Sequence, residues 1–127
     1  MNIQIDIDGT IDKAPVFFRW LTNNLKTSEH KVFIVTSRTS SPMNDAETEK
    51  ELKGYGIMYD KLVLTPNLKD LDSKRFPSDM NPGAQLYIHK LFTAEDNNID
   101  ILFDDCGITT ELFRKYLPEV KVFRLLP

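Results

Sequence analysis

The feature that most restricts how this chain can fold is the run Lys31-Val32-Phe33-Ile34-Val35-Thr36. The run is short, rich in β-branched residues and apolar at every inner position, so it predicts a strand with both faces buried. Strands of this kind are typical of parallel sheets that helices cover on two sides. The run therefore predicts a central parallel strand in an α/β protein.

Apolar runs and helical stretches alternate along the rest of the chain. We expect further strands at residues 3–7, 61–64, 101–103 and 120–125, and helices at residues 15–25, 43–55 and 109–117 and in the later part of 86–98. This alternation predicts a three-layer α/β/α sandwich with a central, mainly parallel, Rossmann-like sheet. In the first helix, four residues at helical spacing are expected in the core: Val16, Phe17, Trp20 and Leu21.

Length and composition describe an ordinary globular domain. The 127 residues favour a single domain, residues 1–127, with 41% hydrophobic residues and a net charge of −3. The acidic balance disfavours a general nucleic-acid coat, which would need a basic surface. Cys106 is the only cysteine, so no internal disulfide forms and a reducing compartment is expected. We expect the Cys106 side chain to have a packing role. No apolar run reaches membrane-spanning length and the start lacks a signal peptide, so the expected location is the cytoplasm, without a membrane partner.

Polar side chains follow three of the predicted strands. In open α/β sheets, ligands bind at the carboxyl ends of the strands, so these residues are the candidate site. They are Asp6, Asp8, Gly9 and Thr10 after the first strand, Thr36, Ser37 and Arg38 after the second, and Asp104 and Asp105 after the fourth.

The four carboxylates are the main chemical clue. Each aspartate alone could simply cap a turn. Two carboxylates 4 Å apart, however, repel by about 4 kcal/mol at an effective dielectric constant of 20, so a cluster at adjoining strand ends calls for a cation. Hard oxygen ligands without soft neighbours favour Mg²⁺, which also binds substrate phosphate.

The same segments resemble signatures of the haloacid dehalogenase-like (HAD) hydrolase superfamily. Residues 3–10 are similar to the first signature, and residues 32–38 resemble the second, an apolar strand ending in Thr or Ser. Residues 101–105 resemble the fourth, an apolar strand ending in paired acids. The third signature is a lysine upstream of that strand; Lys90 fits it best, and Lys69 and Lys74 are its rivals.

The resemblance implies a role for each matching residue. Asp6 would be the nucleophile that forms an aspartyl-phosphate, and Asp8 would be the general acid and then the base. Thr36 would hydrogen-bond the phosphoryl oxygen, and Lys90 would neutralise charge. Mg²⁺ would be held by Asp6, Asp104, the backbone carbonyl of Asp8, and Asp105 directly or from an outer position. The expected substrate contacts are Gly9, Thr10, Ser37 and Arg38.

The chain is shorter than most members of that family, which carry a cap over the site. The gaps between residues 10 and 31 and between 38 and 90 are too small for a cap domain, so the resemblance is to a small capless member. Its open site would admit large substrates or a lid from another subunit. Residues 66–83 are predicted as a long loop, either a flap whose Lys69, Lys74 and Arg75 bind an anionic substrate or a solvated surface loop.

The expected function is that of an enzyme, a Mg²⁺-dependent phosphomonoester hydrolase acting on a nucleotide or another small phosphorylated metabolite. Asp8 favours phosphoryl transfer over dehalogenation, because dehalogenating members lack an acid there. Two alternatives stay open: a non-catalytic phosphate-binding or interaction protein with this fold, and a phosphatase of polynucleotides or proteins. A response-regulator-like phosphoacceptor is disfavoured, because its acceptor would follow the third strand, which ends in Thr65-Pro66. The oligomeric state is left open.

Overall fold

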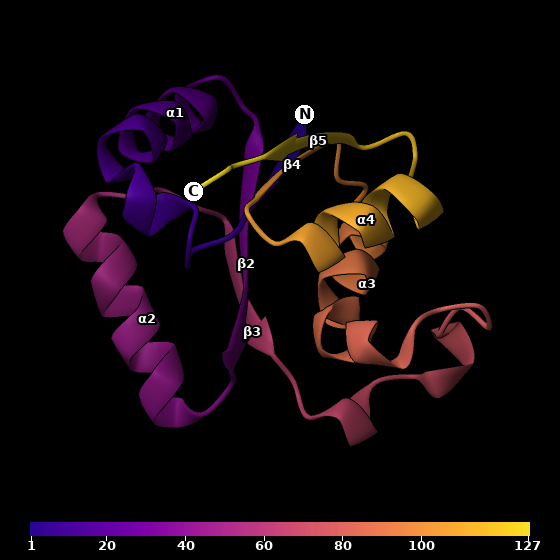
Figure 1. Ribbon diagram of the computed structural model, residues 1–127. Helices are drawn as coiled ribbons and strands as arrows, with labels where there is room; N and C mark the ends of the chain where they lie inside the picture. The colour runs from indigo at the N-terminus through magenta and orange to yellow at the C-terminus, as the bar shows by residue number, and fades with distance from the viewer.

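The computed structural model describes residues 1–127 and alternates strands with helices along the chain (Figure 1). The strands are β1 (Asn2–Ile5), β2 (Lys31–Thr39), β3 (Lys61–Thr65), β4 (Ile101–Asp104) and β5 (Lys121–Arg124). The α-helices are α1 (Pro15–Thr27), α2 (Pro42–Tyr55), α3 (Ile88–Asp96) and α4 (Gly107–Tyr116). Every predicted strand and helix is present, with boundaries moved by a few residues.

All five strands are parallel, and they form one sheet in the order β3-β2-β1-β4-β5. In the central strand β1, Ile3 lies opposite Val32 of β2 on one side and Ile101 of β4 on the other. Helices α1 and α2 cover one face of the sheet, and α3 and α4 cover the other (Figure 1). The predicted three-layer α/β/α sandwich with a Rossmann-like sheet is therefore confirmed.

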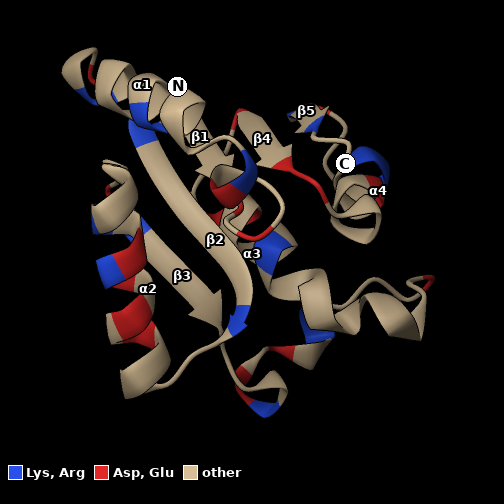
Figure 2. Cartoon of the chain, turned by 60° about the vertical axis from the view of Figure 1, so that its left-hand side comes forward, with Lys and Arg blue, Asp and Glu red and all other residues tan.

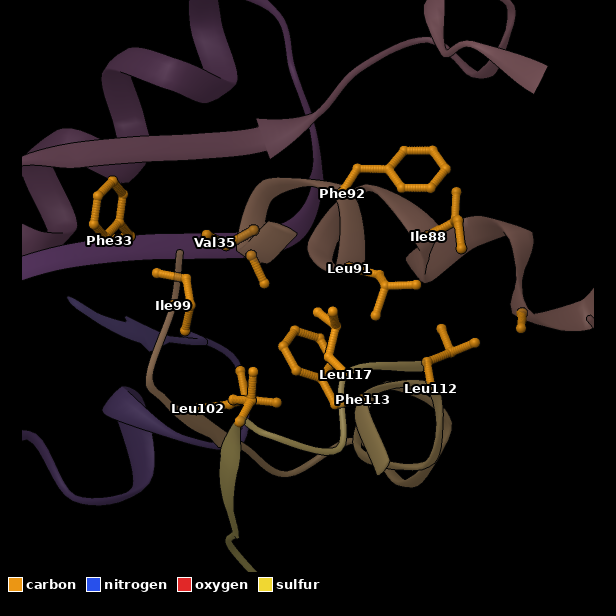
Figure 3. Packing of buried hydrophobic residues seen from close by; sticks show 13 residues of the cluster. Phe33, Val35, Ile88, Leu91, Phe92, Ile99, Leu102, Leu112, Phe113 and Leu117 are labelled. Atoms are coloured by element: carbon orange, nitrogen blue, oxygen red, sulfur yellow. The ribbon is translucent and has the colours of Figure 1, made fainter. Parts of the chain in front are cut away.

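Each face of the sheet has its own hydrophobic core. Between the sheet and helices α3 and α4, Figure 3 shows Val35 and Leu102 facing Ile88, Leu91 and Phe113. On the opposite face, the buried residues include Ile3, Ile5, Ile34, Phe18 and Leu52. The two cores explain why β2 is apolar on both faces, with Val32 and Ile34 in one core and Phe33 and Val35 in the other. None of the helices combines the length and the hydropathy that crossing a bilayer requires.

The face of α1 that packs on the sheet differs from the predicted one. Val16, Phe17 and Trp20 are 66%, 41% and 62% exposed, and Leu21 is half-buried, whereas Phe18 is buried and meets Phe103 edge-on at 5.6 Å between ring centroids. The helix carries two overlapping apolar stripes, and the inward one includes a polar residue, Thr22. Its hydroxyl accepts a hydrogen bond from the Met58 N–H (3.2 Å), which explains why counting apolar residues selects the wrong stripe.

The segment between β3 and α3 is not an irregular loop. It contains three 3₁₀ helices, η2 (Leu68–Asp70), η3 (Ser73–Arg75) and η4 (Pro82–Tyr87). The Arg75 guanidinium pairs with Glu95 at 3.0 Å and Asp96 at 2.9 Å, and it lies 4.3 Å from the centre of the Phe92 ring. Arg75 therefore ties this segment to α3 instead of being free for an anionic substrate.

The burial of α1 can be tested by paired truncations. We expect Phe18→Ala to lower the free energy of unfolding by about 3–5 kcal/mol, because it leaves a cavity in the core. Phe17→Ala, on the exposed face, should cost less than about 1 kcal/mol. Urea unfolding of the two variants measures the difference, and equal losses would contradict the orientation of α1.

Candidate functional site

The candidate residues meet at the carboxyl edge of the sheet, as expected for parallel strands. Asp6 directly follows β1, Asp104 ends β4, and these two strands are neighbours. In Figure 2, the acidic segments after β1 and β4 lie near a basic segment of α3. The sheet order thus brings together residues that are almost a hundred positions apart in the chain.

Three carboxylates form a tight cluster at this edge. One oxygen each from Asp6, Asp104 and Asp105 lies within 4.8 Å of the others. The Lys90 ammonium donates to Asp6 Oδ1 at 3.1 Å and to Asp104 Oδ2 at 2.8 Å. Asp6, Lys90 and Asp104 are all buried, so these ion pairs are shielded from water.

Lys90 is the only one of the three candidate lysines in an ion pair with these acids. Lys69 and Lys74 are exposed in the 3₁₀ segment and pair with no acid of the cluster. The Gln4 side-chain amide, fully buried on β1, donates to the Lys90 backbone carbonyl at 3.2 Å. Gln4 and the two aspartates therefore hold the lysine at both its backbone and its ammonium group.

The electrostatics of the cluster are unbalanced. Burial raises the pKa of Asp6 to about 7; the Lys90 ammonium opposes this rise and the Asp104 carboxylate adds to it. Burial by itself would lower the pKa of Lys90, but its two carboxylate partners outweigh burial and raise it. Three carboxylates and one ammonium leave two negative charges when all are ionised. Oxygen ligands with this net charge fit a divalent cation such as Mg²⁺, which Asp6, Asp104 and Asp105 could hold.

Gly9 serves the cluster through its backbone. It has a positive φ of 84°, and a Cβ atom there would overlap the Asp105 carboxylate. Its N–H donates to Asp12 Oδ1 at 2.7 Å, which closes the turn after β1. Gly9 is expected from the sequence to contact substrate. In the structure, its lack of a side chain lets the Asp105 carboxylate approach the turn after β1.

The Asp8 side chain lies apart from the acid cluster. It is 59% exposed, and its two oxygens accept hydrogen bonds from Arg38 Nε (2.9 Å) and Nη2 (2.7 Å). These hydrogen bonds lower the pKa of Asp8. Arg38 also donates to Glu51 at 2.6 Å and Thr48 at 3.3 Å, so α2 holds the guanidinium in place.

The remaining expected contacts differ in accessibility. Thr36 is buried where the pairing of β2 with β3 shifts register, and its hydroxyl accepts the Arg38 N–H at 3.2 Å. Ser37 is exposed, so it remains accessible to a ligand. Thr10 is fully buried with an unpartnered hydroxyl, and it cannot touch a substrate without rearrangement.

His89 lies beside the site and is structural. Its Nε2 is 2.9 Å from the Thr36 carbonyl oxygen and 3.3 Å from Thr65 Oγ1. Burial lowers the pKa of His89 to about 4, so the ring is neutral at pH 7. The histidine connects α3 to the ends of β2 and β3.

Four supporting residues were not identified from the sequence: Gln4, Asp12, Thr48 and Glu51. Gln4 had a usable signal, because it is a polar residue between two isoleucines of a predicted strand. Asp12 lies three residues after Gly9, the spacing at which an acidic side chain reaches back to a backbone N–H in a capping box. Thr48 and Glu51 had no such signal, since they lie on a helix with many similar polar residues.

Neutralising Asp6 should stabilise the metal-free protein. The raised pKa means that ionised Asp6 costs stability as pH rises from about 4 through about 7, so the cost is fully present at pH 8. We expect Asp6→Asn to raise the free energy of unfolding in EDTA at pH 8 by about 2 kcal/mol, with a smaller gain at pH 5. Urea unfolding at the two pH values measures this; a loss at pH 8 would contradict the charge imbalance.

The fold is similar to that of solved structures. Two chains superpose with a TM-score of 0.65 each, one from the "Structure of Pnkp1/Rnl/Hen1 complex" at 19% identity and one from the "Structure of the Pnkp1/Rnl/Hen1 RNA repair complex" at 18% identity. The match covers 98% of this chain but only 45% and 42% of those chains, so this chain spans less than half their length. No protein-family model and no curated protein matches the sequence. At this level of identity, the similarity establishes the fold alone.

Proposed function

We propose that the protein is a divalent-metal-dependent phosphomonoester hydrolase of the HAD-like kind, with Asp6 as its nucleophile. The observation that carries this proposal is the position of the Lys90 ammonium, within 3.1 Å of Asp6 and 2.8 Å of Asp104 at the carboxyl edge of the sheet. A buried carboxylate beside a fixed cation and two further acids is suited to phosphoryl transfer, where positioning and charge neutralisation supply most of the catalysis.

In the first step, an Asp6 carboxylate oxygen forms a bond to phosphorus while the ester P–O bond breaks. The electron pair of that bond goes to the leaving oxygen, which takes a proton from Asp8. In the second step, water attacks the aspartyl-phosphate, loses a proton to Asp8 and releases inorganic phosphate. Asp6 returns to its starting form, so atoms and charges balance over the cycle.

The side chains around Asp6 have separate roles in the proposed reaction. Lys90 opposes the rise in the pKa of Asp6 that burial causes, and it offsets charge on the transferring group. The Thr36 hydroxyl is fully buried within β2, so it would orient a phosphoryl oxygen only after a local rearrangement. A divalent ion held by Asp6, Asp104 and Asp105 would supply further charge neutralisation at phosphorus.

The Asp8–Arg38 pair has to open or weaken during the reaction. A general acid must carry a proton, and the two hydrogen bonds from Arg38 favour the ionised carboxylate. A substrate phosphate would compete for Arg38, since guanidinium groups bind phosphate oxygens in the same bidentate way. Arrival of substrate would therefore release Asp8 to take up a proton.

The substrate is a nucleotide or another phosphorylated metabolite, or alternatively a polynucleotide end. Two observations support the second substrate. The Asp8 side chain is 59% exposed, so the site is open to a large molecule. The structures with a similar fold are chains of an assembly described as an RNA repair complex, although this chain spans less than half of them.

Phosphate release from a panel of monoesters tests the function directly. The panel contains p-nitrophenyl phosphate, mononucleotides, sugar phosphates and oligonucleotides with a terminal phosphate, each with Mg²⁺ and with EDTA. We expect release only with Mg²⁺, and a loss of about 10³-fold or more in Asp6→Asn and Lys90→Met. Lys74→Met is the matched control and should keep full activity. Release that persists in Asp6→Asn would contradict the proposed nucleophile, and absent release from every ester would favour a binding role.

The pH profile tests the role of Arg38. Because Arg38 lowers the pKa of Asp8, Arg38→Gln should raise that pKa. A general acid must be protonated in the free enzyme, so the alkaline limb of kcat/KM should move to higher pH in Arg38→Gln and stay near its original position in Arg38→Lys. An alkaline limb that moves to lower pH, or that stays in place in Arg38→Gln, would contradict the assignment of Asp8.

A further inference from the structure

A cavity lies between the Asp79–Ala84 segment and α4. It has a volume of about 550 Å³, within the range of small-ligand sites. Its floor includes Gly107, which is three residues after Asp104, and the intervening Cys106 N–H donates to Asp104 Oδ1 at 2.9 Å. The cavity lining is therefore joined to the acid cluster through residues 104–107.

One charged group in this cavity has no charged partner. Lys115 pairs with Asp79 at 2.9 Å, and Glu111 pairs with Arg114 at 3.0 Å. Arg124 makes no ion pair; its Nε donates only to the Asp105 backbone carbonyl at 3.3 Å. The cavity thus presents one uncompensated positive charge next to the acid-bearing loop.

The backbone at Gly107 brings this guanidinium close. A Cβ atom at position 107 would lie 3.0 Å from Arg124 Nη2, so the absence of a side chain lets the guanidinium rest on the chain there. The first turn of α4 contains no acidic residue. Arg124 lies opposite Asp104 in the strand register but forms no ion pair with it, so its guanidinium is available to an anion that enters the cavity.

The other walls suit an uncharged ring. Ile108, 44% exposed, contributes an apolar surface together with Met80 and Tyr116. Asn81 Oδ1 accepts the Gly83 N–H at 2.9 Å, which leaves the Asn81 amide group free to donate to a ligand acceptor. The lining combines an apolar surface, a hydrogen-bond donor and one cation.

We propose that this cavity binds the leaving group of a polynucleotide end, with a base against Ile108 and Tyr116 and the adjoining phosphodiester on Arg124. This inference rests on the proposed phosphatase function, because the terminal phosphate would then lie at Asp6. A phosphodiester carries one negative charge, which a single guanidinium balances. The apolar wall would have no partner in a sugar phosphate.

Binding of a dinucleoside monophosphate tests the cavity without the phosphatase chemistry. ApA has two bases and one phosphodiester but no phosphomonoester, so it needs no acid cluster and can be titrated in EDTA by NMR. We expect amide shifts at Ile108, Tyr116 and Arg124, and at least about tenfold weaker binding in Arg124→Gln. Lys121→Gln is the control, since it removes an exposed cation from the other end of β5. Absent binding, shifts elsewhere, or equal losses in both variants would overturn the proposal.

Turnover then separates the two proposals. In wild-type protein, a dinucleotide with a terminal phosphate should be a better substrate than p-nitrophenyl phosphate. The ratio of their kcat/KM values should fall at least tenfold in Arg124→Gln, mainly through KM of the dinucleotide. If neither ester is hydrolysed but ApA binds at Arg124, the phosphatase proposal fails and the cavity remains a nucleotide site. If both esters are hydrolysed and Arg124→Gln leaves the ratio unchanged, the cavity proposal alone fails.

Discussion

The buried ion pairs of Lys90 with Asp6 and Asp104 are the interaction on which the rest of the site depends. They join α3 to the ends of β1 and β4, three elements that are separated in sequence and meet only in the folded protein. Removing Lys90, the one cation, would strand both carboxylates away from water, and the loss of such a buried partner typically costs about 3–5 kcal/mol. Here one lysine ammonium faces three carboxylates, so the negative charges outnumber the positive one. The cluster is therefore held together, but it keeps a surplus of negative charge.

A second set of contacts positions the open side of the site. The register shift in β2 places Arg38 where it spans Asp8 and Glu51, and so connects α2 to the turn after β1. The turn itself closes tightly because Gly9 has a positive φ and no side chain to meet Asp105. Asp6 and Asp104 are thus buried, whereas the Asp8 side chain is exposed and held by Arg38.

Local pattern predicted more of the fold than of the site. The periodicities located every strand and helix, because strand and helix patterns depend on neighbouring residues. The prediction of which face of α1 is buried was wrong. Two stripes of the helix carry apolar residues, and only the contacts with Phe103 and Met58 decide which stripe packs on the sheet. The prediction of a long loop at residues 66–83 was also wrong, because the segment forms three 3₁₀ helices. Arg75 fixes it by pairing with Glu95 and Asp96, some twenty residues further along the chain.

The sequence by itself determined the α/β class and the acids at the ends of the first and fourth strands, but not the end of the second, because β2 continues through Thr36, Ser37 and Arg38 to Thr39. These properties are written in short segments, where side-chain alternation and β-branching decide the local conformation. Only the tertiary structure decided which lysine meets those acids, that Asp8 turns toward Arg38, and that Arg124 is left without a carboxylate. The physical reason is that these outcomes depend on distances between groups remote in sequence, and those distances are set by the order of strands and by the packing of helices on them.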